Sequence, residues 1–463
     1  MAYKNKNKKV VVVGGNAAGM SAASKARRTN PNLEISVFEK GKFVSYSACG
    51  LTYLISGVVK DVSDLILRTP EQFAQQGIVV HTNHEVTEID RRRRLVSGTD
   101  EDGHKFEENY DKLIIATGGS AAKPPIEGID HKNIFRLRQI EDALAIQEYI
   151  RTNHPKRAIV VGGGFIGLEM VEALDKLGLE VVLLEQSSQL LPNLDADMSA
   201  LVEKYLVLKG ITVMTENKVI AFSANAAPTS SGCSTGELSA VRTEDGNSIP
   251  ADLAFLGLGV RPNVQLATMA GIEIGSTGAI AVAESMRTNA IDVYAAGDCA
   301  EVKHLITNKY IYLPSGTTAN KQGRVAGENA AGGYATFKGI VGTAVNKVMD
   351  MVYARTGLTE KEAKNGGYVF KTVRVDVPAH ASYYENPPQI SVKLVYDSRN
   401  ERLLGGQMVG QDGIAKRIDV LATALQAGMT IEDISRLDLS YAPPFAPVWD
   451  AILVAANVAR RET

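Results

Sequence analysis

The chain has 463 residues, 45% of them hydrophobic and 22% charged, and a formal net charge of -2 at pH 7. That length predicts about three domains, and the near-neutral charge gives no general attraction to nucleic acid or to an anionic membrane. The three cysteines, Cys49, Cys233 and Cys299, lie far apart, which excludes a secreted disulfide scaffold and a Cys-x-x-Cys zinc module. No stretch approaches the roughly 18 apolar residues that span a bilayer, so we expect a reduced, cytoplasmic protein.

A strand, a glycine-rich turn and a helix occur twice along the chain. The first copy starts with the valine run 10–13 and continues into an alanine-rich helix that ends near Arg28. The second copy runs from Ala158 to Gly178. Apolar runs of this kind predict strands that are buried on both faces of a parallel sheet. We therefore predict an α/β fold with two Rossmann-like dinucleotide-binding domains.

The second copy has the complete pattern of a dinucleotide site. In such a site the glycines permit a tight turn, a close approach to the pyrophosphate and close packing of helix on strand. The N-terminus of the helix then meets the phosphates, and an acidic residue at the end of the next strand binds the ribose. Because a carboxylate would repel a 2′-phosphate, this acid favours NADH over NADPH. The expected residues are Gly162, Gly164, Gly167 and Glu185.

The rest of the sequence indicates where the domain boundaries lie. The segments 89–94 and 98–103 indicate a meander, and Pro124 with Pro125 marks a crossing between domains. The stretch 223–236 is rich in small polar residues and predicts a mobile hairpin tip, on which Cys233 is exposed without a function. After about residue 335, alternating antiparallel strands at 368–377 and 389–396 and a helix at 415–427 predict an α+β domain. The expected domains are residues 1–124 with 258–335, residues 125–257, and residues 336–463.

These motifs together resemble the flavoprotein disulfide reductases that have two dinucleotide-binding domains. The resemblance covers essentially the whole chain and includes the turn 116–118 and the segment that ends in Asp298. It implies FAD in the first unit, a nicotinamide nucleotide in the second, and a homodimer formed by the C-terminal α+β dimerisation domain. Asn16 departs from the pattern at the second glycine position of the first unit. The resemblance implies the following residues for FAD: Gly14, Gly15, Gly19, Glu39, Lys40, Ala116, Thr117, Gly118 and Asp298.

The segment 45–57 contains Cys49 and no second cysteine. It resembles the single-cysteine branch of that family, which includes the coenzyme A-disulfide reductases and NADH-dependent sulfur reductases. The resemblance implies that NADH reduces FAD, that the flavin opens a sulfur–sulfur bond made by Cys49, and that the thiolate then attacks a disulfide substrate. If Cys49 begins a helix, we expect the helix dipole to lower the pKa of its thiol.

The substrate implied by this branch is coenzyme A disulfide, or a coenzyme A persulfide or polysulfide. Ser21, Lys25 and Arg28 are spaced to share one helix face, and a cationic stripe would attract the phosphates of coenzyme A. Ser45 is expected near the thiol end. Tyr384 and Tyr441 lie in segments that resemble those closing the substrate site from the partner subunit, and we expect them to reach its Cys49.

Two residues of the second helix and one cysteine complete the expected site. Phe165 resembles the aromatic gate over the nicotinamide pocket, and its alternative is an ordinary core aromatic. Glu169 is expected near the junction of flavin and nicotinamide, and its alternative is a place on a solvated helix face. Cys299 is expected to be a packed cysteine.

Three other functions remain open at the sequence level. An NADH oxidase or peroxidase of the same superfamily would carry a histidine in the first glycine turn, where this chain has Ala17. A carrier-type ferredoxin reductase needs no active cysteine, so the segment around Cys49 argues against it. A flavin-binding scaffold without activity is the weakest alternative. Neither a nucleic acid nor a membrane is expected as a partner.

Overall fold

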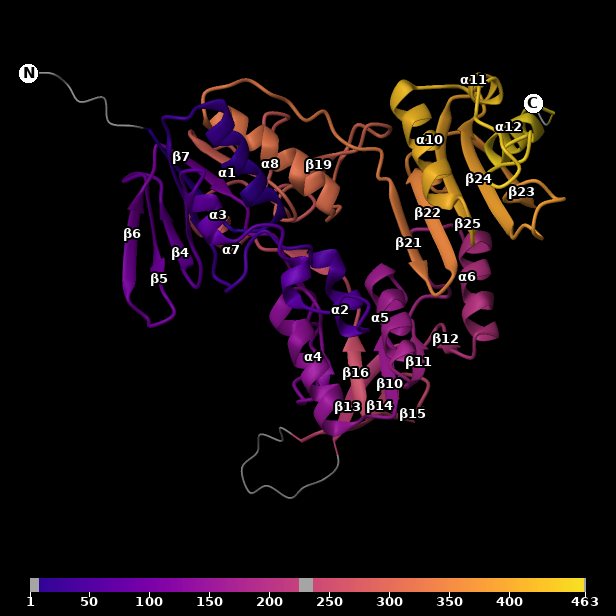
Figure 1. Cartoon of the computed structure of the whole chain (residues 1–463), viewed down its shortest axis with the longest axis horizontal. Helices are drawn as coiled ribbons and strands as arrows, with labels where there is room; N and C mark the ends of the chain where they lie inside the picture. Colours follow the sequence, from indigo (N-terminus) through magenta and orange to yellow (C-terminus); the bar gives the residue numbers. More distant parts are fainter. Residues whose placement is uncertain (1–7, 225–235, 462–463) are drawn as a thin grey trace, which may run out of the picture.

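A computed structural model describes residues 8–224 and 236–461 of the chain. The chain forms three bodies: the first dinucleotide-type unit, the second below it, and the C-terminal domain beside both (Figure 1). Cys233 and most of the expected hairpin tip lie outside the described residues. Within these two ranges no helix has both the length and the hydropathy needed to cross a bilayer.

The first unit is built on a parallel five-stranded sheet in the order β18-β7-β1-β2-β3. A three-stranded antiparallel meander, as the sequence predicts, lies beside it. Its elements are β1 (Lys9–Val13), α1 (Ala17–Thr29), β2 (Glu34–Phe38), α3 (Pro70–Ala74), β3 (Ile78–His81), β4 (Glu85–Asp90), β5 (Leu95–Thr99), β6 (Lys105–Asn109), β7 (Lys112–Ile115), α7 (Gln265–Met269), β18 (Val293–Ala295), β19 (Val302–Lys303), β20 (Tyr310–Ile311) and α8 (Gly316–Ala330).

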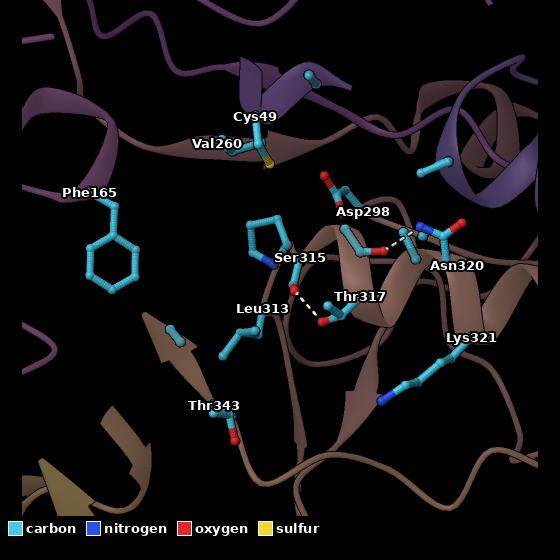
Figure 2. Close-up of a pocket in the computed structure, with 18 of the residues that line it drawn as sticks. Cys49, Phe165, Val260, Asp298, Leu313, Ser315, Thr317, Asn320, Lys321 and Thr343 are labelled. Carbon is cyan, nitrogen blue, oxygen red and sulfur yellow. Dashed lines mark hydrogen bonds between the residues drawn. The ribbon is translucent and has the colours of Figure 1, made fainter. Parts of the chain in front are cut away.

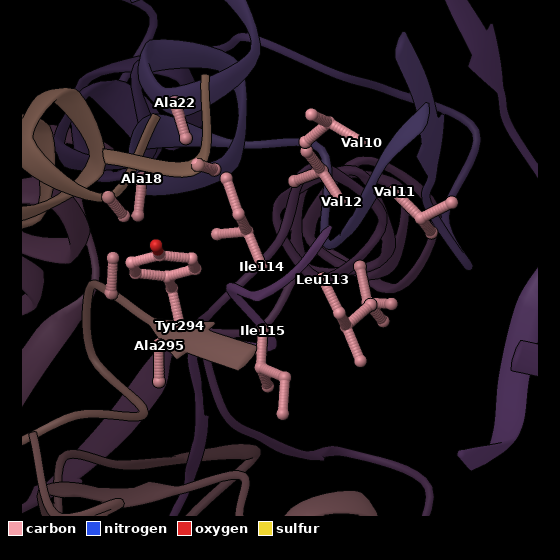
Figure 3. Close-up of a cluster of buried hydrophobic side chains, with 14 of the residues drawn as sticks. Val10, Val11, Val12, Ala18, Ala22, Leu113, Ile114, Ile115, Tyr294 and Ala295 are labelled. Carbon is pink, nitrogen blue, oxygen red and sulfur yellow. The ribbon is translucent and has the colours of Figure 1, made fainter. Parts of the chain in front are cut away.

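The valine run lies at the centre of this unit. Val10, Val11 and Val12 are completely buried between the neighbouring strands and α1, and Figure 3 shows their side chains beside those of β7. Burial of each such side chain contributes roughly 1.5–3 kcal/mol. The interpretation of this run as a strand with two covered faces is confirmed, and it places the turn after β1 at the carboxyl edge of the sheet.

The second unit repeats this plan with the order β12-β11-β10-β16-β9, again parallel. Two short strands, β8 (Gly119–Ala121) and β17 (Val260–Pro262), pair where the chain crosses between the units. The other elements are β9 (Ile134–Phe135), α4 (Ile140–Asn153), β10 (Arg157–Val161), α5 (Phe165–Lys176), β11 (Glu180–Leu184), α6 (Ala196–Leu208), β12 (Thr212–Met214), β13 (Val219–Ala224), β14 (Leu238–Thr243), β15 (Ser248–Pro250) and β16 (Leu253–Leu256).

The segment that carries Cys49 packs on the second unit, although the sequence assigns it to the first. Helix α2 (Leu51–Ile55) buries Leu51 and Leu54 in one core cluster with Ile140 of α4 and Leu168 of α5. Figure 1 shows α2 beside these two helices. This segment therefore belongs to the first unit by its position in the chain but packs at the interface with the second unit.

The C-terminal domain is an antiparallel sheet in the order β21-β22-β25-β24-β23 with helices on it. The strands expected at 368–377 and 389–396 pair as predicted, and the helix expected at 415–427 is present. The elements are β21 (Ala344–Val348), β22 (Met351–Gly357), α9 (Glu360–Asn365), β23 (Phe370–Pro378), β24 (Gln389–Asp397), β25 (Leu403–Gly410), α10 (Ile414–Ala427), α11 (Ile431–Ser435) and α12 (Ala451–Arg461).

Candidate active site

A cavity of about 2380 Å³ joins all three bodies. Asn16 and Cys49 line it from the first unit and its extension, Phe165 lines it from the second unit, and Thr343 lines it from the C-terminal domain. Figure 2 shows the sulfur of Cys49 and the ring of Phe165 directed into this space, with Asp298 nearby. The two turns that the sequence singles out therefore open into one common volume.

The first glycine turn is a tight cradle for phosphate. Gly14 has φ +108°, and a Cβ there would lie 2.1 Å from the carbonyl oxygen of Ala116. A Cβ on Gly19 would lie 1.8 Å from the oxygen of Gly14, so both positions exclude larger residues. Helix α1 begins at this turn without a side-chain cap or an acidic residue in its first turn. Its free amides are therefore available to an anion.

Asn16 takes the second glycine position without a clash. At the equivalent Gly164 of the second unit, a Cβ would meet nothing within 4 Å. The side-chain oxygen of Asn16 accepts a hydrogen bond of 3.2 Å from the amide of Tyr46. The departure from the motif thus ties the turn to the segment that leads to Cys49.

The Glu39 carboxylate is fixed by two backbone amides at the first glycine turn. The carboxylate accepts from the amides of Gly15 at 2.6 Å and Gly41 at 2.8 Å. Burial raises the pKa of this carboxyl group, while the two amides oppose the shift. Lys40 is exposed beside it, and its charge also favours the ionised carboxylate.

The turn 116–118 and Asp298 are organised by two residues that sequence reasoning missed. Asn263 donates to the carbonyl oxygen of Thr117 at 2.8 Å, and the Thr117 hydroxyl donates to the carbonyl oxygen of Asn263 at 2.7 Å. Arg138 forms an ion pair of 2.6 Å with Asp298. These partners come from distant parts of the chain, so no local sequence signal identifies them.

The second turn reproduces the first. Gly162 has φ +106°, and a Cβ on Gly167 would lie 1.9 Å from the oxygen of Gly162. The Glu185 carboxylate accepts from the amides of Gly163 and Ser187, each at 2.8 Å. Helix α5 also begins without a side-chain cap. All four expected nucleotide residues thus lie together at the carboxyl edge of the second sheet.

Phe165 and Glu169 lie where α5 meets the other two bodies. The Phe165 ring lines the cavity and packs at 5.8 Å from the ring of Tyr353. Glu169 accepts from Thr52 at 3.3 Å and from Asn346 at 2.7 Å, so it is not on a solvated face. Burial raises the pKa of this carboxyl group, and its two hydrogen bonds oppose the shift.

Cys49 lies in a 3-10 turn, Ala48–Gly50, that precedes the five-residue helix α2. It is exposed at the cavity surface. The expected lowering of its pKa by a helix dipole is wrong for this structure. Desolvation raises the pKa of the thiol first, and the charge of Glu169 raises it further, whereas Arg138 opposes the shift. A helix this short brings too little dipole to outweigh burial.

Cys299 is the packed cysteine that the sequence predicts. It is completely buried, and its sulfur lies 3.4 Å from the carbonyl oxygen of Ala296 and 3.5 Å from that of Ile115.

The structure separates the three residues of the expected stripe on α1. Ser21 and Arg28 line the cavity, but Lys25 does not; it forms an ion pair of 2.9 Å with Glu328 on α8. Ser45 lines the cavity with φ +50°. Sequence reasoning missed further lysines and arginines of the lining, because they come from distant segments. Five cationic residues of the cavity lining form no ion pair with the described part of the chain. They are Arg28, Arg68, Lys309, Lys321 and Arg324.

The two tyrosines expected at the partner's Cys49, Tyr384 and Tyr441, make different contacts within the chain. Tyr441 bonds through its hydroxyl to the hydroxyl of Tyr383 at 2.8 Å, and Tyr383 is 74% exposed. Tyr384 instead packs edge-on against His380 at 5.6 Å. Tyr383, which sequence reasoning missed, is therefore the residue of this loop that pairs with Tyr441.

Known families match nearly the whole chain. Residues 8–323 match the pyridine nucleotide-disulphide oxidoreductase family, and residues 343–451 match the dimerisation domain of the same family. The chain belongs to this family. Its members use FAD and NAD(P)H, and the two cradles with uncapped helices and ribose-type acids fit two such dinucleotides.

Individual relatives cover the chain end to end. A Pyrococcus horikoshii protein named NAD(P)H coenzyme A polysulfide/persulfide reductase is 38% identical, across 98% of this chain and 99% of its own length. A Methanocaldococcus jannaschii protein named NADH oxidase is 36% identical, with 98% and 99% covered. The solved structure of a NAD-dependent persulfide reductase from A. fulgidus has a TM-score of 0.93 and 42% identity, covering 98% of this chain and 83% of that one.

Proposed function

We propose that the chain uses NADH to reduce coenzyme A disulfide, or coenzyme A persulfide or polysulfide, through Cys49. The observation that carries this proposal is a single exposed thiol on a cavity shared by both dinucleotide cradles. The other described cysteine, Cys299, is buried and bonded to backbone. Cys49 therefore needs a small external thiol as its disulfide partner.

The first cradle, with Glu39, Thr117 and Asp298, would hold FAD, and the second, with Glu185, would hold NADH. FAD, when bound, would take a hydride from NADH and supply an electron pair to the sulfur–sulfur bond at Cys49. Phe165 lines the cavity at the start of α5 and would limit the access of water to the second cradle. Arg138 keeps the Asp298 carboxylate in place through its ion pair.

The thiol chemistry at Cys49 then proceeds by disulfide exchange. The Cys49 thiolate attacks one sulfur of the substrate disulfide, forms a mixed disulfide and releases one coenzyme A thiolate. Two electrons open the mixed disulfide, release the second coenzyme A thiolate and return Cys49 as thiolate. In sum, NADH, one proton and the disulfide become NAD⁺ and two thiols. The charge of Glu169 raises the pKa of the Cys49 thiol and so disfavours the thiolate.

Coenzyme A would bind with its phosphates at the unpaired cations of the cavity. A pyrophosphate and a 3′-phosphate carry several negative charges, which arginine and lysine recognise. Arg28 offers such a charge, whereas Lys25 is already neutralised by Glu328. Ser21 and Ser45 line the same cavity and can add hydroxyl contacts.

The C-terminal domain would form a homodimer, as its family match indicates. Tyr441 and Tyr383 form one bonded pair on an exposed face, and in the dimer these phenols could donate to sulfur in the partner's site. The exposed apolar side chains of this face are Tyr383, Tyr441, Phe445, Val448 and Trp449.

NADH oxidase activity is a second candidate, because one relative with 36% identity carries that name. The two functions differ in what Cys49 carries. Intact mass of the purified protein with and without reductant would distinguish them. We expect a reducible adduct of coenzyme A mass on Cys49 and NADH consumption that depends on coenzyme A disulfide under anaerobic conditions. NADH consumption that requires oxygen and ignores the disulfide would overturn the proposal.

A further inference from the structure

The loop that follows β11 is held from outside its own unit. It begins at Glu185, the acid proposed for the NADH ribose, and ends at Asp195, the N-cap residue of α6. At its far end the loop meets three strands and one helix of the C-terminal domain. The contacts there are polar and almost completely buried, which is uncommon unless each group is satisfied.

Asp195 is the centre of these contacts. The Gln407 side chain donates to the Asp195 carboxylate at 2.6 Å and accepts from the Asp195 amide at 2.7 Å. The Lys393 ammonium lies 3.3 Å from the same carboxylate, and the amide of Glu360 donates to it at 3.0 Å. Asp195, Lys393 and Gln407 are 8%, 5% and 1% exposed. Removal of one partner would leave a buried polar group unpaired.

A second contact with the C-terminal domain is made at Asn193, two residues before Asp195. Arg355 of β22 donates to the carbonyl oxygen of Asn193 at 2.7 Å, and Asn193 lines the central cavity. Arg355 is itself oriented by bonds to Glu362 at 2.6 Å and 3.1 Å. The end of the loop is therefore fixed at two points by side chains of the C-terminal domain.

The other side of the loop bears directly on the glycine turn. The Leu191 amide donates to the carbonyl oxygen of Gly163 at 2.9 Å, while the amide of Gly163 donates to Glu185. A Cβ on Gly163 would lie 2.5 Å from the side chain of Leu190. A shift of the loop would consequently move the turn and the ribose acid together.

We infer that Gln407 and Lys393 are positioning residues for the pyridine nucleotide, acting through Asp195 and the loop 185–195. The C-terminal domain thus completes the NADH site as well as the dimer interface. This inference rests on the proposed NADH site at Glu185. It adds to that site a dependence on residues that no nucleotide motif contains.

The test uses the FAD-loaded enzyme with saturating coenzyme A disulfide. Gln407→Leu removes both hydrogen bonds to Asp195 and replaces the amide by an apolar side chain of similar size. We expect the KM for NADH to rise about tenfold, with kcat at saturating NADH within about twofold, and the KM for the disulfide and the FAD content unchanged. Hydrogen exchange should increase in residues 185–195 and not in the equivalent loop 39–49.

Two further variants make the result decisive. Ser391→Ala is the matched control, because Ser391 lies on β24 near Lys393 and bonds to Asp376 within its own domain; it should leave the KM for NADH unchanged. Asp195→Asn keeps the shape, removes the charge and replaces one acceptor oxygen by an amide donor, so it should also raise the KM for NADH and serves if Gln407→Leu does not fold.

The outcomes separate this inference from the proposal beneath it. If Glu185→Ala raises the KM for NADH and the Gln407 and Asp195 variants do not, the positioning role is overturned and the site stands. If Glu185→Ala also has no effect, the proposed NADH site itself is wrong. A parallel rise in the KM for the disulfide would show a general loss of structure and would equally overturn the positioning role.

Discussion

In the first unit the loop after Glu39 leads to Cys49, and in the second unit the loop after Glu185 leads to Asp195. The backbone of the two loops corresponds step by step. Ser45 and Leu191 each come six residues after the acid, each has positive φ (50° and 47°), and each donates its amide to the residue after the first glycine, at 2.9 Å.

Cys49 and Asp195 each follow four residues later; Asp195 lies directly before α6, and Cys49 lies two residues before α2. One is exposed to the cavity and the other is buried against the C-terminal domain. A repeated framework has thus been put to two uses. In the first unit the end of the loop presents a thiol to the cavity, and in the second it attaches the glycine turn to the C-terminal domain.

The largest expected effect concerns Cys49, at the end of the loop in the first unit. Cys49→Ser should lower disulfide reduction by about a thousandfold or more, because the nucleophile is lost. FAD content and the KM for NADH should stay unchanged, since neither cradle is altered. Steady-state rates and the flavin absorbance after NADH addition measure this. Cys299→Ala is the control, and a Cys49→Ser enzyme that keeps most of its activity would refute the mechanism.

The next effect concerns the acid of the second unit. Glu185→Ala should narrow the preference for NADH over NADPH about tenfold, which corresponds to roughly 1.4 kcal/mol, because repulsion of the 2′-phosphate is removed. Comparison of kcat/KM for both nucleotides tests it. Glu180→Ala, at the other end of β11 and exposed, should leave the ratio unchanged. A wild-type preference for NADPH would contradict the assignment.

A smaller effect separates two cations of α1. Arg28→Ala should raise the KM for coenzyme A disulfide a few-fold, more than for a small uncharged disulfide, and added salt should weaken the difference. Lys25→Ala should instead cost about 0–1 kcal/mol of stability through its ion pair with Glu328. If the two variants raise this KM equally, the distinction drawn from their contacts is wrong.

The smallest expected effect concerns the thiol itself. Glu169→Gln removes a negative charge that raises the pKa of Cys49, so the pKa should fall and more thiolate should be present at pH 7. Alkylation of the reduced enzyme at that pH should accelerate a few-fold. Glu172→Gln, one turn further along α5 and paired with Lys347, is the control. No acceleration would mean that the Glu169 carboxyl is uncharged there.

Much of the fold followed from local pattern. The valine run, the glycine spacing and the acids Glu39 and Glu185 identify two dinucleotide units, because a turn around a phosphate requires these residues at short, regular intervals. The alternating strands and the helix of the C-terminal domain were also predicted. In the same way Cys49 stood out, since its neighbours in the chain form a motif.

The tertiary structure decided what those residues touch. Arg138 with Asp298, Asn263 with Thr117, and Gln407 with Asp195 join distant positions of the chain, and no sequence period relates such partners. The tertiary structure also decided that Lys25 forms an ion pair with Glu328 and that Tyr383 bonds to Tyr441. The sequence alone determined the two cradles and the thiol, because each needs only local geometry. The charge state of that thiol and the support of the second cradle depend on burial and on long-range pairing, which exist only once the three bodies are assembled.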